Sequence, residues 1–281
     1  MKTGVVDVGG GLRGIYAAGV FDRCMEDGVL FDLGIGVSAG SANIMAYIAG
    51  QKKRNYVFYT EYTQRKEYMS AKNFLLKHSY LDLDYVYGTL TNSDGEYPLD
   101  YEAFMKCPME YIAVATDART GKPKYFGKKD TRQDDYSILK ASCAIPGVCH
   151  PYKVDGVPYY DGALGDTIPV KKALSMGCGK VVLVLTKPRD TIREPGKDNF
   201  FAKMIGGRYP DAALRLRHRA QQYNAGVAFT KRLEQEGKAL IVAPEDTCGV
   251  DTLTKDPQKL KLLYQRGYED GAAIAPFVRA K

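Results

Sequence analysis

The sequence predicts an α/β fold of three layers, with helices on both faces of a mainly parallel central sheet. Two observations favour this fold. Short apolar runs of strand type alternate with longer segments of helical character from the first residues onward, and such alternation builds parallel sheets. Glycine-rich turns follow the first two of these runs, each before a predicted helix. No internal repeat or linker-like segment interrupts the pattern, so one domain spanning residues 1–281 is expected.

The elements are expected in the following order. Residues 4–8 and 33–37 are short apolar runs that predict the first two strands. A helix is expected over 13–28, where apolar residues recur at helical spacing before Gly28 ends the pattern, and a small-residue helix over 41–49. The later expectations are helical or irregular structure over 52–104, paired strands at 111–116 and 124–126, a helix at 137–144, strands at 180–186 and 240–243, and helices at 211–235 and 257–273.

Composition favours a cytoplasmic protein without a disulfide framework or a zinc site. No apolar run approaches the roughly 20 residues that span a bilayer. The N-terminus lacks the charged and long apolar regions of a signal peptide. The six cysteines are dispersed and form no C-x-x-C pair, so reduced thiols are expected.

The net charge of +7 favours contact with anionic surfaces, and a transient contact with a membrane surface is compatible with it. Basic residues cluster at 51–54 and 215–219, but charge runs usually face water. No nucleic-acid-binding motif accompanies them, so no nucleic-acid partner is expected.

The first glycine-rich turn fits half of a dinucleotide-binding pattern. Residues Gly9–Gly14 read G-G-G-L-R-G and match G-x-G-x-x-G between a strand and a helix. The pattern also needs an acidic residue at the carboxyl end of the second strand, to hold the ribose. Asp32 stands at the start of that strand instead. The ribose position is therefore missing, although phosphate binding by the loop remains an alternative.

The second glycine-rich turn carries a candidate nucleophile. Gly36, Ser38 and Gly40 form G-x-S-x-G, the nucleophile-elbow pattern, between an apolar strand and a helix. Small neighbours allow the sharp turn, and the N-terminus of the following helix favours negative charge developing at the hydroxyl. We therefore expect Ser38 to attack an acyl carbonyl.

The two turns can serve one reaction if adjacent parallel strands bring them to the same edge of the sheet. The N–H groups of Gly10 and Gly11 would then point at the carbonyl oxygen, which becomes an oxyanion and needs preorganised donors. Glycine suits this position because the backbone approaches a ligand closely. Arg13 either adds positive charge there or is an exposed arginine at the start of a helix.

Asp161 is the expected base for Ser38. It lies in Tyr159–Asp166, where small residues follow it at a strand end and leave room beside the serine. Partial burial would raise its pKa towards working pH. Among the three histidines, His218 would fit an α/β-hydrolase order of Ser, Asp and His, and His150 is a further alternative.

These motifs together resemble the patatin-like phospholipase family. Its oxyanion loop, serine elbow and D-G-[GA] motif appear in order as Gly9–Gly14, Gly36–Gly40 and the run Asp161, Gly162 and Ala163. The stretch Ala141–Gly147 is similar to the A-S-x-A-x-P segment of the family. The motif-bearing core covers about residues 3–185, and the remainder is similar to small bacterial members.

The resemblance implies hydrolysis of fatty acyl esters by a Ser–Asp dyad, without a metal or another cofactor. It makes Ser38 the site of an acyl-enzyme ester and Asp161 the general base. It assigns the oxyanion hole to Gly9, Gly10, Gly11, Arg13 and Gly14. Many members carry the aspartate directly before the glycines, whereas Val8 intervenes here, which leaves open which N–H group serves.

Three alternatives remain open. The chain is also compatible with a histidine-assisted esterase or thioesterase on non-lipid substrates, a nucleotide-binding protein, or a catalytically idle lipid-binding module. The expected partner under the main hypothesis is a lipid or another acyl ester. The apolar and basic segment Phe200–Ile205 either covers the site, touches a lipid surface, or is a loop packed on the core.

Overall fold

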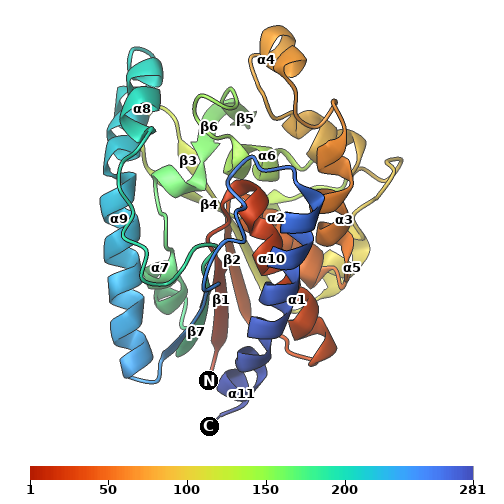
Figure 1. Ribbon diagram of the computed structural model, residues 1–281, viewed down its shortest axis with the longest axis vertical. Coiled ribbons are helices and arrows are strands. Elements are labelled where there is room, and N and C mark those ends of the chain that lie inside the picture. The colour runs from red at the N-terminus through yellow and green to blue at the C-terminus, as the bar shows by residue number, and fades with distance from the viewer. Residues whose placement is uncertain (281) are drawn as a thin grey trace.

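A computed structural model describes residues 1–280 and confirms the three-layer α/β fold (Figure 1). The strands are β1 (Thr3–Asp7), β2 (Leu33–Val37), β3 (Glu110–Asp117), β4 (Pro123–Gly127), β5 (Tyr152–Val154), β6 (Val157–Asp161), β7 (Lys180–Val184) and β8 (Ala239–Val242). They form one sheet in the order β5-β6-β3-β2-β1-β7-β8, with β4 paired to β3 beside this path. The pairings β3–β2, β2–β1, β1–β7 and β7–β8 are parallel. Strands β4, β5 and β6 add an antiparallel edge.

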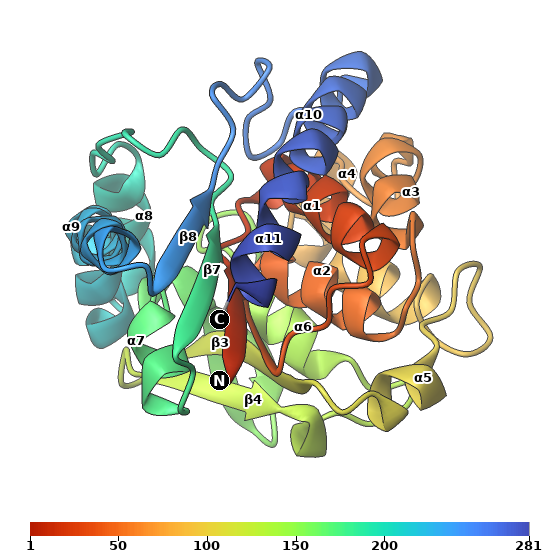
Figure 2. The ribbon, with the colours of Figure 1, turned by 90° about the horizontal axis from the view of Figure 1, so that it is seen from below.

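Helices cover both faces of the sheet (Figure 2). They are α1 (Ile15–Glu26), α2 (Ala39–Ile48), α3 (Arg54–Thr60), α4 (Ala71–Lys77), α5 (Tyr101–Lys106), α6 (Ser137–Cys143), α7 (Val170–Ser175), α8 (Asp198–Gly206), α9 (Pro210–Gln235), α10 (Pro257–Asp270) and α11 (Ile274–Arg279). Helices α7 and α9 lie against one face, and α1, α2, α10 and α11 lie on the other.

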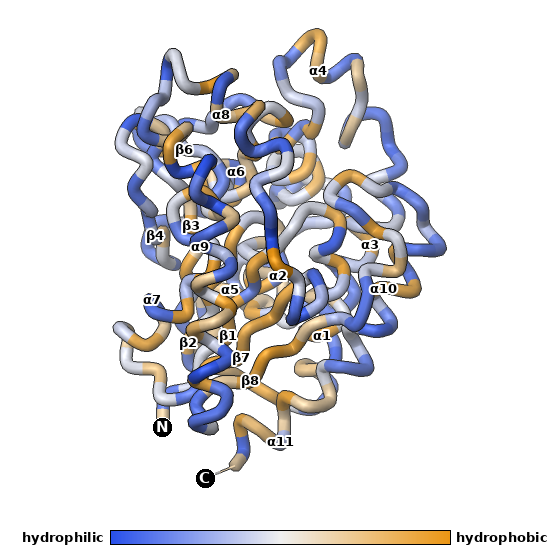
Figure 3. The backbone as a smooth tube through the Cα atoms, turned by 60° about the vertical axis from the view of Figure 1, so that its left-hand side comes forward, coloured by the Kyte–Doolittle hydropathy of each residue, from blue (hydrophilic) through white to orange (hydrophobic). Residues whose placement is uncertain are grey.

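Strand β1 shows how the sequence produces two cores. Val5 packs with residues of α1 and α2, whereas its neighbour Val6 packs with residues of α9. Successive side chains of a strand point to opposite faces, so a strand covered on both sides must be apolar throughout. Figure 3 shows the central strands as predominantly hydrophobic.

The expected strands agree with the structure to within two residues at each end, but several helices differ. The helix expected from Arg13 begins at Ile15, because Gly11–Gly14 forms a separate 3-10 turn. The segment Phe200–Ile205 belongs to α8, so the alternative that it is a loop packed on the core is wrong. Its spacing of Phe201, Ala202 and Ile205 suits one buried helical face. Helices α4 and α7 and strand β5 carried no clear signal.

Among residues 1–280, none of the helices combines the length and apolar character needed to cross a membrane. The cytoplasmic location and the single-domain organisation both stay predictions.

Candidate active site

Parallel pairing brings both glycine-rich turns to the carboxyl edge of the sheet. In the register of β1 with β2, Asp7 lies opposite Gly36, so the two turns start side by side. They also interlock. A Cβ on Gly9 would lie 2.3 Å from the carbonyl oxygen of Val37, and one on Gly40 would lie 2.4 Å from that of Asp7. Glycine is required at these two positions because backbone packs directly against backbone.

The glycine loop leaves two backbone N–H groups without an acceptor. Gly9, Gly10 and Gly11 adopt φ angles of 63°, 132° and 61°. The N–H of Gly9 donates to Asp7 Oδ1 at 2.9 Å and is therefore not available to a substrate. Within residues 1–280 the structure records no acceptor for the N–H of Gly10 or Gly11, and both residues line a cavity with Ser38. These two groups are the candidates to hold an oxyanion.

Ser38 occupies a strained turn directly before α2. Its φ of 56° and ψ of −132° lie outside the regions that non-glycine residues ordinarily adopt, at a cost of about 1–3 kcal/mol. A Cβ on Gly36 would lie 2.3 Å from Cα of Ser41, so only glycine allows the turn to close. Ser41 Oγ donates to the carbonyl oxygen of Ser38 at 2.6 Å. The side chain of Ser38 is buried.

Asp161 ends β6 and is buried. Its Oδ1 accepts the N–H of Ala163 at 2.8 Å, and its carbonyl oxygen accepts the hydroxyl of Thr116 at 2.8 Å. A Cβ on Gly162 would lie 2.2 Å from the carbonyl oxygen of Val114, which explains the glycine after the aspartate. Burial raises the pKa of Asp161, and donors at Ser38 and Ala163 together with nearby arginines oppose that rise.

The A-S-x-A-x-P segment holds both Ser38 and Asp161. Ser142 Oγ accepts the N–H of Ser38 at 3.0 Å and donates to the carbonyl oxygen of Val114 at 2.7 Å. Two residues further on, the carbonyl oxygen of Ala144 accepts the N–H of Asp161 at 2.9 Å. The segment therefore positions the candidate nucleophile and the candidate base against each other. Sequence reasoning noted the pattern and missed this role.

Replacing Ser142 with alanine is expected to lower kcat about 10- to 100-fold with little change in KM, because displacing a nucleophile by about an ångström has effects of this size. Loss of two buried hydrogen bonds should also lower the free energy of unfolding by about 1–3 kcal/mol. Ester kinetics and thermal unfolding measure both effects. Ser175→Ala, which removes an exposed hydroxyl, is the matched control. A folded Ser142→Ala variant with full kcat would contradict the positioning role.

A buried network of hydrogen bonds stabilises the glycine loop. Asp7 Oδ2 accepts Asn43 Nδ2 at 2.9 Å, and Asn43 also donates to the carbonyl oxygen of Gly14 at 3.0 Å. The hydroxyl of Tyr59 donates to Asn43 Oδ1 at 3.2 Å. Burial raises the pKa of Asp7 to about 6, against the donors Asn43 and Gly9. Gly14 thus belongs to the support of the loop, and sequence reasoning missed Asn43 and Tyr59 altogether.

Arg13 is not the exposed arginine that the sequence left as one alternative. Its side chain is buried, and a Cβ on Gly10 would lie 3.3 Å from its Nη2. Arg13 Nη1 donates to Asp251 Oδ1 at 2.6 Å and to Thr252 Oγ1 at 3.1 Å. The guanidinium therefore lies beside the glycine loop and is anchored by a distant segment of the chain.

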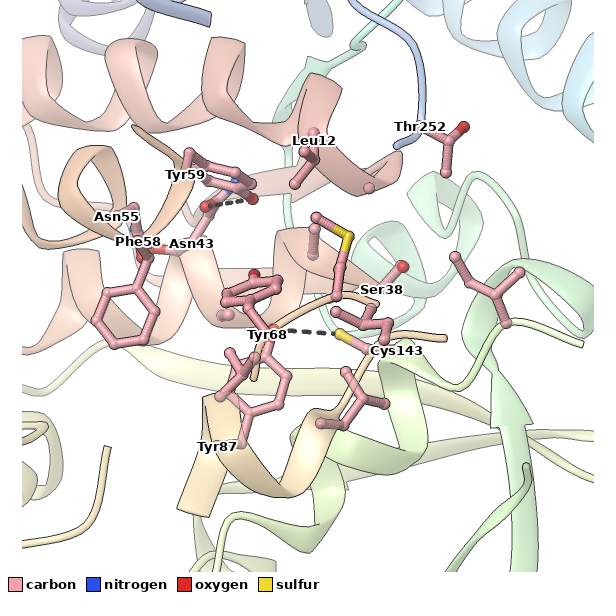
Figure 4. A pocket seen from close by; sticks show the side chains of 18 of the residues that line it. Leu12, Ser38, Asn43, Asn55, Phe58, Tyr59, Tyr68, Tyr87, Cys143 and Thr252 are labelled. Carbon is pink, nitrogen blue, oxygen red and sulfur yellow. Dashed lines mark hydrogen bonds between the residues drawn. The ribbon is translucent and has the colours of Figure 1, made fainter. Parts of the chain in front are cut away.

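An apolar pocket opens from Ser38 towards α3 (Figure 4). Its free volume is about 50 Å³, and its lining includes Leu12, Phe58, Tyr59, Tyr68, Met69 and Leu83. The hydroxyl of Tyr87 lies 3.4 Å from Cys143 Sγ in this lining. One cation, Arg54, also reaches the pocket, where its guanidinium stacks on Phe58 and donates to the carbonyl oxygen of Tyr97.

A second cavity, of about 380 Å³, extends from Ser38 towards α8 and α9. Asp161, Gly10 and Gly11 line it together with several basic side chains. Ser38 thus lies where the apolar pocket meets this second cavity, which we call the polar cavity because charged side chains line part of its wall.

Comparison with known proteins identifies the family. The model of the patatin-like phospholipase family matches residues 8–174, more than half of the chain. The chain belongs to the patatin-like phospholipase family. An uncharacterized protein of Escherichia coli, YjjU, is 31% identical over 199 residues, which are 69% of this chain and 54% of that protein. An uncharacterized NTE family protein of Mycobacterium tuberculosis is 38% identical over 68 residues, 24% of this chain and 18% of the relative.

Against the curated relatives, this patatin-like chain spans about half the length of the first and less than a fifth of the second. Among solved structures, VipD from Legionella pneumophila has a TM-score of 0.50 and 14% identity, covering 98% of this chain and 67% of that one. At this identity the likeness shows the fold alone.

A second family model, a domain of unknown function (DUF6363), matches residues 209–278. This C-terminal segment of the patatin-like protein reaches the candidate active site. The carbonyl oxygen of Thr252 accepts the N–H of Leu12 at 3.0 Å, and Asp251 anchors Arg13. A Cβ on Gly11 would lie 2.4 Å from the same carbonyl oxygen. The glycine loop is therefore enclosed by a segment outside the patatin-family match.

The residues behind the alternative hypotheses lie elsewhere. None of the described residues that line the two cavities at Ser38 is a histidine. His150 stacks on Tyr152, with 4.5 Å between ring centroids, and His218 is exposed on α9. Asp32 accepts the N–H of Thr3 at 2.6 Å, at the amino edge of the sheet and away from the glycine loop. No group of three or more metal-ligating side chains occurs within residues 1–280.

Proposed function

We propose that this patatin-like protein is a serine hydrolase of lipid acyl esters that works through Ser38 and Asp161. The observation that carries the proposal is a strained, buried serine beside a buried aspartate, at the edge where the N–H groups of Gly10 and Gly11 have no acceptor within the described part of the chain. The apolar pocket on one side of Ser38 suits the first carbons of an acyl chain, and the polar cavity on the other side suits the alcohol.

The proposed reaction begins with proton transfer from Ser38 to the Asp161 carboxylate while the serine oxygen attacks the acyl carbon. Donors at Gly10 and Gly11 then hold the oxyanion, and each such donor typically contributes about 3 kcal/mol of transition-state stabilisation. Asp161 returns its proton to the departing alcohol. It next takes a proton from water, which attacks the acyl-enzyme, and it returns this proton to Ser38 Oγ as the fatty acid leaves.

A soluble ester assay tests the function before any lipid is used. We expect the wild-type protein to hydrolyse nitrophenyl butanoate and to react with a fluorophosphonate probe. The variants His150→Ala and His218→Ala should keep full activity, because neither ring lines the cavities at Ser38. Loss of activity in a folded histidine variant would favour a histidine-assisted esterase. Stabilisation by NAD or ATP, without ester turnover, would favour a nucleotide-binding protein.

We further propose that helices α4 and α8 contact the lipid surface. Leu75 and Leu76 are 77% and 69% exposed, and Phe200 and Met204 are 62% and 56% exposed. Both helices stand at the end of the molecule to which the carboxyl edge of the sheet points (Figure 1). Exposed large apolar side chains that gather beside a lipid-binding site are typical of interfacial contact.

Replacing all four side chains with serine is expected to weaken sedimentation with anionic liposomes at least about tenfold, because each apolar side chain that enters lipid contributes about 1–3 kcal/mol. Turnover of nitrophenyl butanoate should not change, since none of the four residues lines a cavity at Ser38. Leu262→Ser, at a 51% exposed site on α10, is the control. Equal sedimentation of the wild type and the fourfold variant would contradict the contact.

A further inference from the structure

The polar cavity at Ser38 carries an excess of positive charge that the proposed chemistry does not use. Five basic side chains line it, namely Arg13, Lys187, Arg193, Lys197 and Arg219. The acidic side chains of the lining are Asp161, Asp198 and Asp251. Two of these acids are engaged with arginines, and Asp161 faces the serine. The cavity is therefore cationic beside the reacting centre.

The arginines are held in place by the surrounding fold. Arg219 Nε donates to Asp198 Oδ2 at 3.0 Å, and Arg193 Nη2 lies 3.8 Å from the same oxygen. The N–H of Arg193 donates to Asn224 Oδ1 at 2.9 Å, and its guanidinium lies over the ring of Tyr223. These contacts fix the two guanidinium groups at the wall formed by α8 and α9.

Lys187 differs from the arginines because its side chain has no partner among the described residues. It follows Thr186, whose hydroxyl donates to the carbonyl oxygen of Gly9, so it stands next to the glycine loop. Within residues 1–280 the structure records no hydrogen bond and no ion pair for its ammonium group, although the side chain is half-buried. Arg13 Nε, on the neighbouring wall, is likewise buried without an acceptor.

The cations of this cavity repel one another. Burial lowers the pKa of Lys187, and the charges of Arg13, Arg193 and Arg219 lower it further. Burial and the neighbouring Arg219 also lower the pKa of Arg193, to about 10. Gathering like charges in a partly buried space is unfavourable unless an anion joins them.

We propose that this cavity binds a phosphate group on the alcohol side of the ester, so that acyl esters of phosphorylated alcohols with a net negative headgroup are preferred. The inference rests on the proposed function, because it takes the apolar pocket as the acyl side. Lys187 and Arg193 contact the phosphate, and arginine matches phosphate oxygens through its forked donors. A zwitterionic headgroup would bring a cation into a cationic cavity, and a neutral alcohol would leave the donors unsatisfied.

Soluble substrates test this preference without a membrane. The three substrates to compare, each as a dissolved monomer, are octanoyl glycerol phosphate, octanoyl glycerophosphocholine and octanoyl glycerol. The wild type should show at least a tenfold higher kcat/KM for the phosphate ester than for the other two. Lys187→Gln should lower kcat/KM for the phosphate ester about tenfold, mainly through KM, because one charge-assisted contact is lost. The same variant should lower kcat/KM for octanoyl glycerol much less than for the phosphate ester, because that substrate has no phosphate to lose a contact.

Two further measurements separate the possible outcomes. Lys261→Gln removes an exposed lysine of α10 outside the cavity and should behave as the wild type. Calorimetry on the Ser38→Ala protein measures binding without catalysis, so the preference is tested even if the ester assay fails. Octanoyl glycerol phosphate should bind that protein at least tenfold more tightly than octanoyl glycerol, and adding Lys187→Gln should remove the difference.

Equal binding of the charged and neutral substrates would overturn the proposal while leaving the hydrolase function intact. Inhibition by inorganic phosphate provides the last test. Weak competitive inhibition of nitrophenyl butanoate hydrolysis by phosphate, relieved in Lys187→Gln, supports the site. Tight inhibition by phosphate without any preference for the phosphorylated ester would assign the cavity to a free anion and overturn the headgroup assignment.

Discussion

Replacing Ser38 with alanine is expected to abolish ester hydrolysis, with a fall in kcat of at least about 10⁴-fold. The reason is that no acyl-enzyme forms without the serine oxygen, while the glycine loop and both cavities persist. The fold should persist as well, because alanine keeps the Cβ and places no larger group in the turn at φ 56°. Fluorophosphonate labelling and nitrophenyl butanoate kinetics measure the effect.

The control for this variant is Ser175→Ala, at a site far from the elbow in the sequence and exposed to solvent. That variant should label and turn over as the wild type does. If Ser38→Ala keeps wild-type labelling, the nucleophile is another residue and the dyad is wrong.

Asp161→Asn is expected to lower kcat about 10³- to 10⁴-fold, as removal of the partner that accepts or orients the nucleophile's proton commonly does. Asparagine retains an oxygen that accepts the N–H of Ala163, and Asp161 has no salt-bridge partner within residues 1–280, so the variant should fold. Labelling of Ser38 should slow in parallel, because the same base activates the serine for both reactions. Full esterase activity in folded Asp161→Asn would exclude Asp161 as the base.

The pH profile gives a second readout of the same residue. Burial raises the pKa of Asp161 above its ordinary value of 3.8, and the base works only when it is ionised. The rate should therefore rise with pH through this raised pKa and reach a plateau above it. In wild-type protein the acidic limb should be present, and in Asp161→Asn the residual rate should lose it.

The individual motifs were predictable from the sequence because each meets a steric requirement within a short stretch of the chain. Gly36 and Gly40 flank Ser38 since a side chain at either position would collide with backbone, and such a turn has a short and recognisable pattern. The strand-and-loop order then predicted that the two glycine turns share an edge, as the pairing of β1 with β2 confirms. The roles of Ser38 and Asp161 in catalysis stay predictions.

The supporting residues were not predictable because their partners are distant in the chain. Ser142 holds the N–H of Ser38 from 104 positions away, and Asn43 joins Asp7 to Gly14 through a side chain buried in a mostly apolar helix. Lys187 carries no motif at all, and only the fold places it beside the glycine loop. Pairing of this kind depends on three-dimensional packing, which single-sequence patterns do not encode.

The contribution of the C-terminal segment to the site was also not predictable from the sequence. Residues after about 185 carry no catalytic motif, yet Thr252 encloses the glycine loop and Asp251 anchors Arg13. A loop that contributes through its backbone carbonyl has almost no sequence requirement. Its place at the site follows from the pairing of β7 with β8, which carries the chain back to the same edge.

Trapping the acyl-enzyme tests whether Ser38 is the nucleophile. The wild-type protein is mixed with nitrophenyl butanoate, quenched in acid during turnover and digested with trypsin, which releases Ser38 within the peptide of residues 24–52. We expect a butanoyl adduct on this peptide, with fragment ions that assign it to Ser38 and not to Ser41, and no adduct in Ser38→Ala. An adduct on another residue, or steady turnover with an unmodified Ser38 peptide at every quench time, would contradict it.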